Sequence, residues 1–376
     1  MVYKLDDYAL ILPVFLILFP VYSRIFLMYT REIQEKRHSP IENGAPLQGT
    51  WTRAFEEVDL LSIHRPYHFP LIRGVRDARI KEWESFIIQD DRFCLQARLG
   101  NFKFFRVALI TVYLRETKER LEFRKVIPGG GWHFPGNLYN ASEDSRAWGF
   151  FFRIHSWLDA EKIKLELNIK SVLQKPAFTA HITFNFTVEK TVPMAVSLLF
   201  SERRNMCAFK ALTAVEGDMV LGGQHIHLDP AKTTGLFCDY KGFYPYQMRS
   251  SWCSGLGFDS QNRRFGFSLG ENQAKEAFSN NENALWINGK LTPLPPVKIT
   301  RNGGPDSDWI IQDMEGMVDL VFTPEESGND IMNYILFTTN YENPLGYFNG
   351  KMVSAKGEEL PVRNVWGTGE KLYLRV

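Results

Sequence analysis

The sequence contains only four cysteines in 376 residues, and none of them stands in a CxxC pair. Cys94, Cys207, Cys238 and Cys253 are widely scattered, which argues against a disulfide framework and against a zinc knuckle. Small, buried thiols in a reducing compartment are the expected arrangement.

Motifs of the common catalytic and nucleotide-binding classes are also missing. The chain has no Gly-x-Ser-x-Gly elbow, no His-Glu-x-x-His, no kinase motif set and no Rossmann fingerprint. Its glycine-rich loop at 128–135 lacks the Gly-x-x-x-x-Gly-Lys pattern of a phosphate cradle. Hydrolase, kinase, zincin and nicotinamide-dependent classes are therefore disfavoured, and no cofactor is predicted. The net charge is only +1, with both signs interspersed, so nucleic acid is not predicted as a partner.

The N-terminus carries an almost unbroken apolar run from Tyr8 to Tyr22, shorter than the roughly 20 residues that span a bilayer. Apolar character resumes at 25–29, so residues 8–29 suffice if Arg24 extends toward the interface. Positive charges follow the run, which predicts a membrane anchor with the body in the cytosol. A cleaved signal peptide and a buried core helix stay open as alternatives.

Aromatic residues are abundant, at 14% of the chain with 29 Phe, which favours an all-β protein with large apolar interiors. Beyond residue 50, helical periodicity is almost absent, and short apolar stretches alternate with turn residues. Asn288-Gly289 is a strong hairpin signal, because both central residues of a type I′ turn need positive φ. Glu315-Gly316 and Lys356-Gly357 are further turns. Evenly spaced strands of this kind indicate barrels or sandwiches.

These patterns divide the chain into four parts. Residues 1–30 are predicted to form the anchor helix, and 31–48 a polar linker that contains proline and glycine. Two antiparallel β-barrels in tandem are expected to follow, at 49–195 and 196–376.

Several motifs of glycines and aromatics resemble the domain of unknown function 2804 family. They are Gly49–Arg53, Lys81–Phe86, Gly242–Tyr246, Trp252–Gly257, Phe267–Gly270, Asn281–Leu291, Gly346–Gly350 and Gly367–Glu370. The likeness spans about residues 43–376. It implies a distant similarity to tandem lipocalin-like proteins such as carotenoid hydratases, tocopherol cyclases, fungal cyclases and lipid-handling survival factors. Two lipocalin-like barrels would then hold an apolar ligand inside or between them. In the enzymatic relatives acids protonate alkenes, but those acids do not align with this chain residue by residue.

The segment from Asp239 to Trp252 is the main candidate for chemistry. A carboxyl among aromatic rings has its pKa raised by desolvation, which suits a general acid acting on an alkene or epoxide. Aromatic faces also stabilise a carbocation. Asp239 is the predicted acid and Arg249 the group that tunes its pKa. Tyr240 is predicted as a third catalytic residue, on the cavity wall, and the predicted ligand-contacting aromatics are Tyr244, Tyr246 and Trp252. In the alternative interpretation these rings close a barrel mouth, and Asp239 pairs with Arg249 or caps a turn.

Three further groups are weaker candidates. Glu271-Asn272 and Glu282-Asn283 flank a polar loop, where Glu282 and Asn283 would contact the ligand or bind backbone N–H groups of neighbouring turns. Glu370 follows Gly367-Thr-Gly, and for it too both a ligand contact and a structural hydrogen bond to backbone N–H groups stay open. A metal site of His225, His227 and Asp229 is the weakest candidate, because a third or fourth ligand must come from elsewhere.

Three functions are consistent with these residues. The first is a membrane-tethered protein that binds or transfers a lipid, isoprenoid or sterol-like molecule. The second is an enzyme of the same geometry that hydrates, cyclises or isomerises such a molecule by proton transfer, with Asp239 as the acid. The third is a non-catalytic scaffold or assembly subunit. Protein partners are not indicated.

Overall fold

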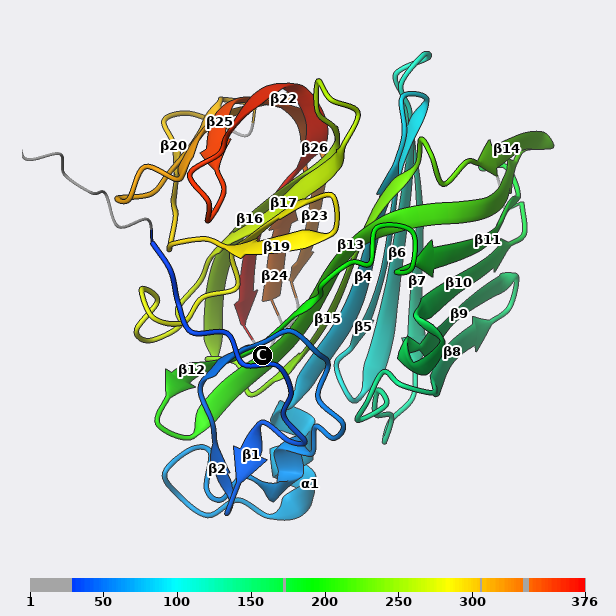
Figure 1. The fold of residues 1–376 in the computed structure, drawn as a ribbon. Coiled ribbons are helices and arrows are strands. Elements are labelled where there is room, and N and C mark those ends of the chain that lie inside the picture. The colour runs from blue at the N-terminus through cyan, green and yellow to red at the C-terminus, as the bar shows by residue number, and fades with distance from the viewer. Residues whose placement is uncertain (1–28, 172–173, 305, 334–337, 376) are drawn as a thin grey trace, which may run out of the picture.

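A computed structural model describes residues 29–171, 174–304, 306–333 and 338–375, and shows an all-β protein built from two large antiparallel sheets (Figure 1). Most of the predicted anchor, residues 1–28, lies outside the described residues. Among the described helices, none combines the length and the apolar character that a membrane crossing requires. They are α1 (Arg73–Arg79) and the 3-10 turns η1 (Leu60–Ser62) and η2 (Leu158–Ala160).

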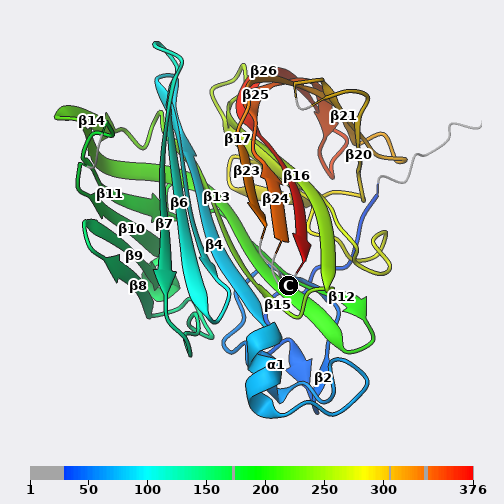
Figure 2. The same cartoon turned by 180° about the vertical axis from the view of Figure 1, so that it is seen from behind.

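The first sheet has 13 strands in the order β7-β6-β5-β4-β15-β13-β11-β10-β9-β8, with β3, β12 and β14 at its side. It curls around its own core like a barrel (Figure 2). Its strands are β3 (Gly49–Trp51), β4 (Lys81–Gln89), β5 (Phe93–Asn101), β6 (Phe105–Leu114), β7 (Glu119–Pro128), β8 (Ala141–Ala147), β9 (Phe150–Trp157), β10 (Lys162–Ile169), β11 (Phe178–Asn185), β12 (Met194–Ser201), β13 (Arg204–Leu221), β14 (Gln224–Leu228) and β15 (Thr234–Gly242).

The second sheet has 11 strands in the order β19-β18-β17-β16-β26-β25-β22-β21-β20, with β24 and β23 branching from β26. It curves around a separate core (Figure 1). Its strands are β16 (Gln247–Phe258), β17 (Arg264–Glu271), β18 (Ala284–Ile287), β19 (Lys290–Pro293), β20 (Lys298–Arg301), β21 (Trp309–Gln312), β22 (Val318–Glu326), β23 (Asn329–Asn333), β24 (Thr338–Glu342), β25 (Leu345–Val353) and β26 (Glu359–Arg375).

The predicted turns join neighbouring strands as the sequence indicates. Asn288 and Gly289 adopt φ of 48° and 76° between the paired residues Ile287 and Lys290, as a type I′ turn demands. The expectation of two tandem antiparallel sheets of barrel-like curvature is therefore confirmed.

The chain passes from the first sheet to the second between β15 and β16, after Gly242. This boundary lies later in the chain than the predicted boundary between the two barrels, after residue 195. The cause is the pairing of β15 with β4 over nine residue pairs, Thr234↔Gln89 to Gly242↔Lys81. Strands β12 to β15 consequently belong to the first sheet.

Residues that precede the first sheet pack closely onto the body. The Tyr29 hydroxyl donates a hydrogen bond to the Phe278 carbonyl (2.6 Å), and the Trp51 indole donates to the Gln34 side chain (2.9 Å). A short hairpin, β1 (Ile41–Glu42) with β2 (Ala45–Pro46), lies within the predicted linker. In the described part, from residue 29 onward, this segment is thus attached to both sheets.

Three apolar cores account for the burial pattern, one inside each sheet and a third between the two sheets. Strand β9 alternates buried and half-buried residues, because only one of its faces is covered. Strand β15 is buried at all nine positions. One of its faces lines the first sheet's interior, and the other, with Leu236 and Tyr240, contributes to the core that also contains Leu256 and Trp366 of the second sheet.

A buried ion pair joins the two sheets within this third core. Lys210 on β13 and Glu282, in the loop before β18, lie 2.8 Å apart, and both side chains are fully buried. The Lys210 ammonium also donates to the Ser268 hydroxyl on β17 (2.9 Å) and to the Glu282 carbonyl (3.1 Å), so all three of its protons are used.

We expect Lys210→Met to destabilise the protein by roughly 3–5 kcal/mol, because the substitution leaves the Glu282 carboxylate buried without its counter-charge. Urea unfolding of the full chain measures this loss. The double variant Lys210→Met/Glu282→Gln should recover part of it, since a neutral amide oxygen still accepts hydrogen bonds. A single variant that is as stable as the parent would show that the pair does not hold the sheets together.

Candidate active site between the sheets

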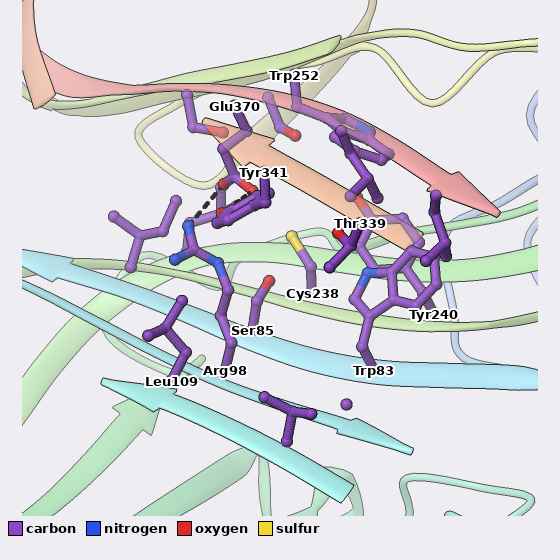
Figure 3. A pocket seen from close by; sticks show the side chains of 18 of the residues that line it. Trp83, Ser85, Arg98, Leu109, Cys238, Tyr240, Trp252, Thr339, Tyr341 and Glu370 are labelled. Carbon is purple, nitrogen blue, oxygen red and sulfur yellow. Dashed lines mark hydrogen bonds and ion pairs between the residues drawn. The ribbon is translucent and has the colours of Figure 1, made fainter. Parts of the chain in front are cut away.

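A mainly apolar cavity of about 170 Å³ lies between the two sheets, and we call it the inter-sheet cavity (Figure 3). For comparison, an engineered apolar cavity of about 150 Å³ binds benzene. Strands β4, β5, β6 and β15 form one wall, and β16, β17, β24 and β26 form the other. The lining residues are Trp83, Ser85, Ile87, Arg98, Gly100, Phe102, Val107, Leu109, Leu236, Cys238, Tyr240, Trp252, Ser254, Ser268, Thr339, Tyr341, Glu370, Leu372 and Leu374.

The side chains reach this cavity because alternate residues of a strand point to the same face. Strand β15 contributes its residues 236, 238 and 240, and β26 contributes 370, 372 and 374. The Cys238 thiol is unreactive here, because burial raises its pKa to about 12.

Arg98, Glu370 and Tyr341 form a charged cluster at one end of the cavity, which we call the Arg98 cluster (Figure 3). The Arg98 guanidinium lies 2.8 Å from Glu370 Oε1, and the Tyr341 hydroxyl donates to Glu370 Oε2 at 2.7 Å. Arg98 also lies over the Tyr341 ring at 5.5 Å and donates to Gln96 at 2.9 Å. Arg98 belongs to the first sheet and its two partners to the second, so this cluster also joins the sheets.

The environment fixes the charge states of Arg98 and Tyr341. Burial lowers the pKa of Arg98, but the facing Glu370 and Tyr341 outweigh it and raise the pKa above its ordinary value. Burial raises the pKa of the Tyr341 phenol well above its usual range; Arg98 opposes this shift, and Glu370 reinforces it. The cluster therefore presents a permanent cation and a neutral hydroxyl beside the Glu370 carboxyl group.

A second cluster surrounds the Glu282 carboxylate, and we call it the Glu282 cluster. Glu282 Oε2 accepts from Lys210 and from the Tyr240 hydroxyl (3.0 Å), and Oε1 accepts from Asn272 (2.7 Å) and the Trp252 indole (3.2 Å). Burial raises the pKa of Glu282, yet Lys210 and these hydrogen bonds outweigh it and lower the pKa. Glu282 is thus an ionised acceptor that orients Tyr240 and Trp252 on the cavity wall.

The structure places the predicted acid, Asp239, outside the inter-sheet cavity. Asp239 follows Cys238 and precedes Tyr240 on β15, so its side chain points into the first sheet's interior. Its carboxylate lies 3.1 Å from the Lys241 ammonium, so the partner that the structure gives it is Lys241 and not the predicted Arg249. Glu84 stands directly opposite on β4.

The other predicted residues are divided between several environments. Tyr240 and Trp252 line the cavity, and Tyr244 stacks on Trp83 with ring centres 4.8 Å apart. Tyr246 is 53% exposed. Arg249 lies over the Tyr373 ring (5.6 Å) at a separate polar groove of the second sheet.

Asn283 has the structural role that the alternative interpretation gave it. Its side chain accepts from the Gly270 N–H (2.7 Å) and donates to the Pro295 carbonyl (2.9 Å), which fixes the loop that carries Glu282. Glu271 accepts from the Ile299 N–H (2.9 Å) and pairs with Lys298.

The weakest candidate, the His225, His227 and Asp229 group, does not converge. Both histidines are exposed on β14; His227 pairs with Asp218 (3.0 Å), and Asp229 accepts from the Ala231 N–H. Within the described ranges, no group of three or more His, Cys, Asp or Glu side chains is placed to hold a metal ion.

Sequence reasoning missed Arg98 and Tyr341. The available signal was the alternation Cys94, Gln96, Arg98 in an otherwise apolar strand, which shows that one face of β5 carries polar groups. Tyr341 lies on β24, and its approach to Arg98 depends on the pairing of β24 with β26, which the sequence does not indicate.

Comparison with known proteins identifies the family and the fold. The sequence profile described as Domain of unknown function (DUF2804) matches residues 30–375. The solved structure of CghA is similar, with 9% identity over 93% of this chain and 99% of that chain, and a TM-score of 0.52. Kievitone hydratase from Nectria haematococca is 15% identical over 78% of this chain and 88% of that chain, with a TM-score of 0.47. No curated protein matches the chain significantly.

The buried carboxyls of the first sheet predict a pH effect on stability. Burial and the neighbouring Asp239 raise the pKa of Glu84 well above 4.5, and among the described residues Glu84 Oε2 has no hydrogen-bond partner. The folded protein therefore holds a proton that the unfolded chain releases, so stability falls as pH rises above the unfolded pKa of Glu84.

We expect Glu84→Gln to remove this dependence. Relative to the parent, the variant should gain stability between pH 5 and pH 8, because the parent's folded state loses the advantage of its bound proton over this range and the amide carries no such proton. Urea unfolding at both pH values measures the difference, and the exposed Glu119→Gln is the matched control. Parallel pH profiles for the parent and Glu84→Gln would mean that Glu84 is ionised in the folded state.

Proposed function

Since the chain belongs to the family described as Domain of unknown function (DUF2804), whose name gives no reaction, we propose a function from the geometry of the inter-sheet cavity. The protein binds an apolar small molecule that carries an oxygen function, and it isomerises, cyclises or hydrates that molecule by proton transfer. The observation that carries this proposal is the Arg98 cluster, an ion pair with a neutral tyrosine on the wall of a mainly apolar cavity.

The lining defines the ligand class. Apolar walls with a few convergent polar groups are typical of small-molecule sites, where the polar groups set orientation. Trp83 and Tyr240, with ring centres 5.2 Å apart, offer flat surfaces at the end away from Arg98 (Figure 3). A ring or conjugated chain would stack there, with its oxygen toward Arg98.

The Arg98 cluster supplies the chemistry. Glu370 Oε1 accepts a hydrogen bond from Arg98, and Oε2 accepts one from Tyr341. Each oxygen has a second lone pair, which can accept a proton from the ligand. Arg98 would stabilise the negative charge that develops on a ligand oxygen when that proton leaves. Tyr341 would orient Glu370 and donate a hydrogen bond. Return of that proton at another carbon completes an isomerisation. In a cyclisation the deprotonated carbon forms a bond to an alkene carbon of the same ligand that is conjugated with a carbonyl group, and the proton returns to the carbon beside that carbonyl. In a hydration Glu370 takes the proton from a water molecule instead, the oxygen of that water adds to the conjugated alkene, and the proton returns to the neighbouring carbon.

Binding or transfer without a reaction would use the same apolar lining. The Arg98–Glu370 ion pair favours an enzyme over a carrier. Removal of these two charges from water is unfavourable, and a protein that only binds apolar ligands does not need charged groups in its cavity. Membrane attachment through residues 1–30 and a cytosolic body stay predictions from the sequence.

The test begins with native mass spectrometry of the detergent-purified full chain, to identify a co-purified small molecule. Incubation in D₂O should then place deuterium on carbon atoms of that molecule. Glu370→Gln should slow this incorporation by about 10²–10⁴-fold, the usual contribution of a general base, while the ligand stays bound.

Asp239→Asn is the matched variant, because it removes the acid predicted from the sequence and leaves the cavity wall unchanged. It should retain deuterium incorporation. Loss of exchange in Asp239→Asn together with full exchange in Glu370→Gln would overturn the assignment to the Arg98 cluster. Thermal unfolding of both variants confirms that they are folded.

A further inference from the structure

The 64–79 segment, which consists of the turn after η1 and helix α1, lies at the end of the molecule where β4 begins (Figures 1 and 2). Three of its large apolar side chains are exposed. Phe69, Ile72 and Val75 are 58%, 76% and 42% exposed, within seven residues of sequence. Pro70 between them is also exposed. These exposed side chains, which we call the apolar tips, thus lie close together in the sequence. Single exposed apolar residues are normal on a protein surface, but a group of them suggests a binding surface.

The inner side of the same segment is firmly held. The Tyr67 ring meets Phe243 edge to face at 6.0 Å, and Arg79 donates to the Tyr67 hydroxyl at 3.1 Å. Arg76 donates to the Ile63 carbonyl at 3.1 Å. Since these contacts fix the backbone, the outward direction of Phe69 and Ile72 is a property of the folded segment.

Positive charge surrounds the apolar tips. Arg65 and Arg73 are exposed within the segment, and Arg203 and Arg204 adjoin it from the turn between β12 and β13. The acids within the segment and this turn are Asp77 and Glu202, and Asp77 lies 3.5 Å from Lys103 and 3.4 Å from His133. Asp59 caps η1, and Glu42 lies on β1 of the neighbouring hairpin, where it is paired with Arg37. Counting Arg76 and Arg79, the 64–79 segment and residues 202–204 together carry six arginines and two carboxylates, so this part of the surface has a net positive charge.

We propose that the 64–79 segment docks this protein onto the surface of an anionic phospholipid bilayer. Exposed apolar tips among arginines suit the boundary between headgroups and acyl chains, where apolar burial and attraction to anionic lipids add. Helix α1 has only seven residues, so the contact is a shallow insertion of side chains and not an amphipathic helix lying in the membrane. This contact is separate from the predicted anchor at residues 1–30.

The docking surface lies close to one end of the inter-sheet cavity, through a short series of contacting residues. Arg79 lies 5.8 Å from the Tyr246 ring centre, and Tyr244, two residues earlier, stacks on Trp83 of the inter-sheet cavity. Docking at this surface would bring the Trp83 end of the cavity close to the bilayer, the phase in which apolar ligands dissolve.

The test uses the full chain reconstituted into phosphatidylcholine vesicles with or without phosphatidylserine. Ile72→Cys is labelled with an environment-sensitive fluorophore, which is selective because all four native cysteines are buried. Nitroxide lipids should quench this label in phosphatidylserine vesicles. The same label on Met314→Cys, at a position 98% exposed on the second sheet, should stay unquenched.

The charge dependence gives a second measurement. Arg65→Glu/Arg73→Glu should lower the equilibrium constant for docking, measured from the quenching at position 72, by at least about fivefold per arginine replaced. Added salt should also weaken docking. An unquenched label at position 72 on vesicle-bound protein would overturn the proposal, because the protein would then be attached elsewhere. Equal quenching in vesicles with and without phosphatidylserine would show that docking does not depend on anionic lipid, which would contradict the proposed contribution of the arginines.

Discussion

The Lys210–Glu282 pair, buried between the two sheets, is the constraint on which the rest of the structure depends. A fully buried ion pair is tolerated only when every proton and lone pair finds a partner, and here Lys210 uses three protons while Glu282 accepts four side-chain hydrogen bonds. Two of those donors, Tyr240 and Trp252, come from opposite sheets. The pair therefore sets both the position of the sheets relative to one another and the direction of two rings on the cavity wall.

A second ion pair crosses the interface at Arg98 and Glu370, and the inter-sheet cavity lies between the two crossings. Apolar sheet faces ordinarily approach until their side chains interdigitate. Here each crossing requires a fixed distance between charged groups that come from different sheets. The stretch between them is lined by Ile87, Leu236 and Cys238 on one side and by Ser254 and Leu372 on the other, and it stays open. The two ion pairs thus fix the spacing of the sheets around the cavity, and one of them, Arg98 with Glu370, also lines it.

Much of this fold could be predicted from the sequence, because strand alternation and turn chemistry are local. The Asn288-Gly289 turn and most strands follow from a few residues each. The pairing of β15 with β4 could not be predicted in this way, since it joins residues about 150 positions apart and depends on the packing of the whole third core. The prediction for Asp239 had a more specific weakness. Adjacent residues of one strand point to opposite faces, so Asp239 and Tyr240 cannot share a cavity; alternation alone could have separated them.

The same alternation separates two kinds of buried acid in this protein. Glu84 and Asp239, which lie opposite each other on the first sheet's inner face, have their pKa values raised by burial, and for Asp239 this rise persists although Lys241 lies 3.1 Å away. Glu282, which pairs with Lys210 across the two sheets, has its pKa lowered instead, because this pairing and its hydrogen bonds overcome burial. Proton abstraction needs a carboxylate that is already ionised, and a cation close enough to stabilise the product charge. At the inter-sheet cavity, Glu370 and Arg98 come from different sheets and lie 2.8 Å apart, so a carboxyl group and a cation stand together beside the space for the ligand.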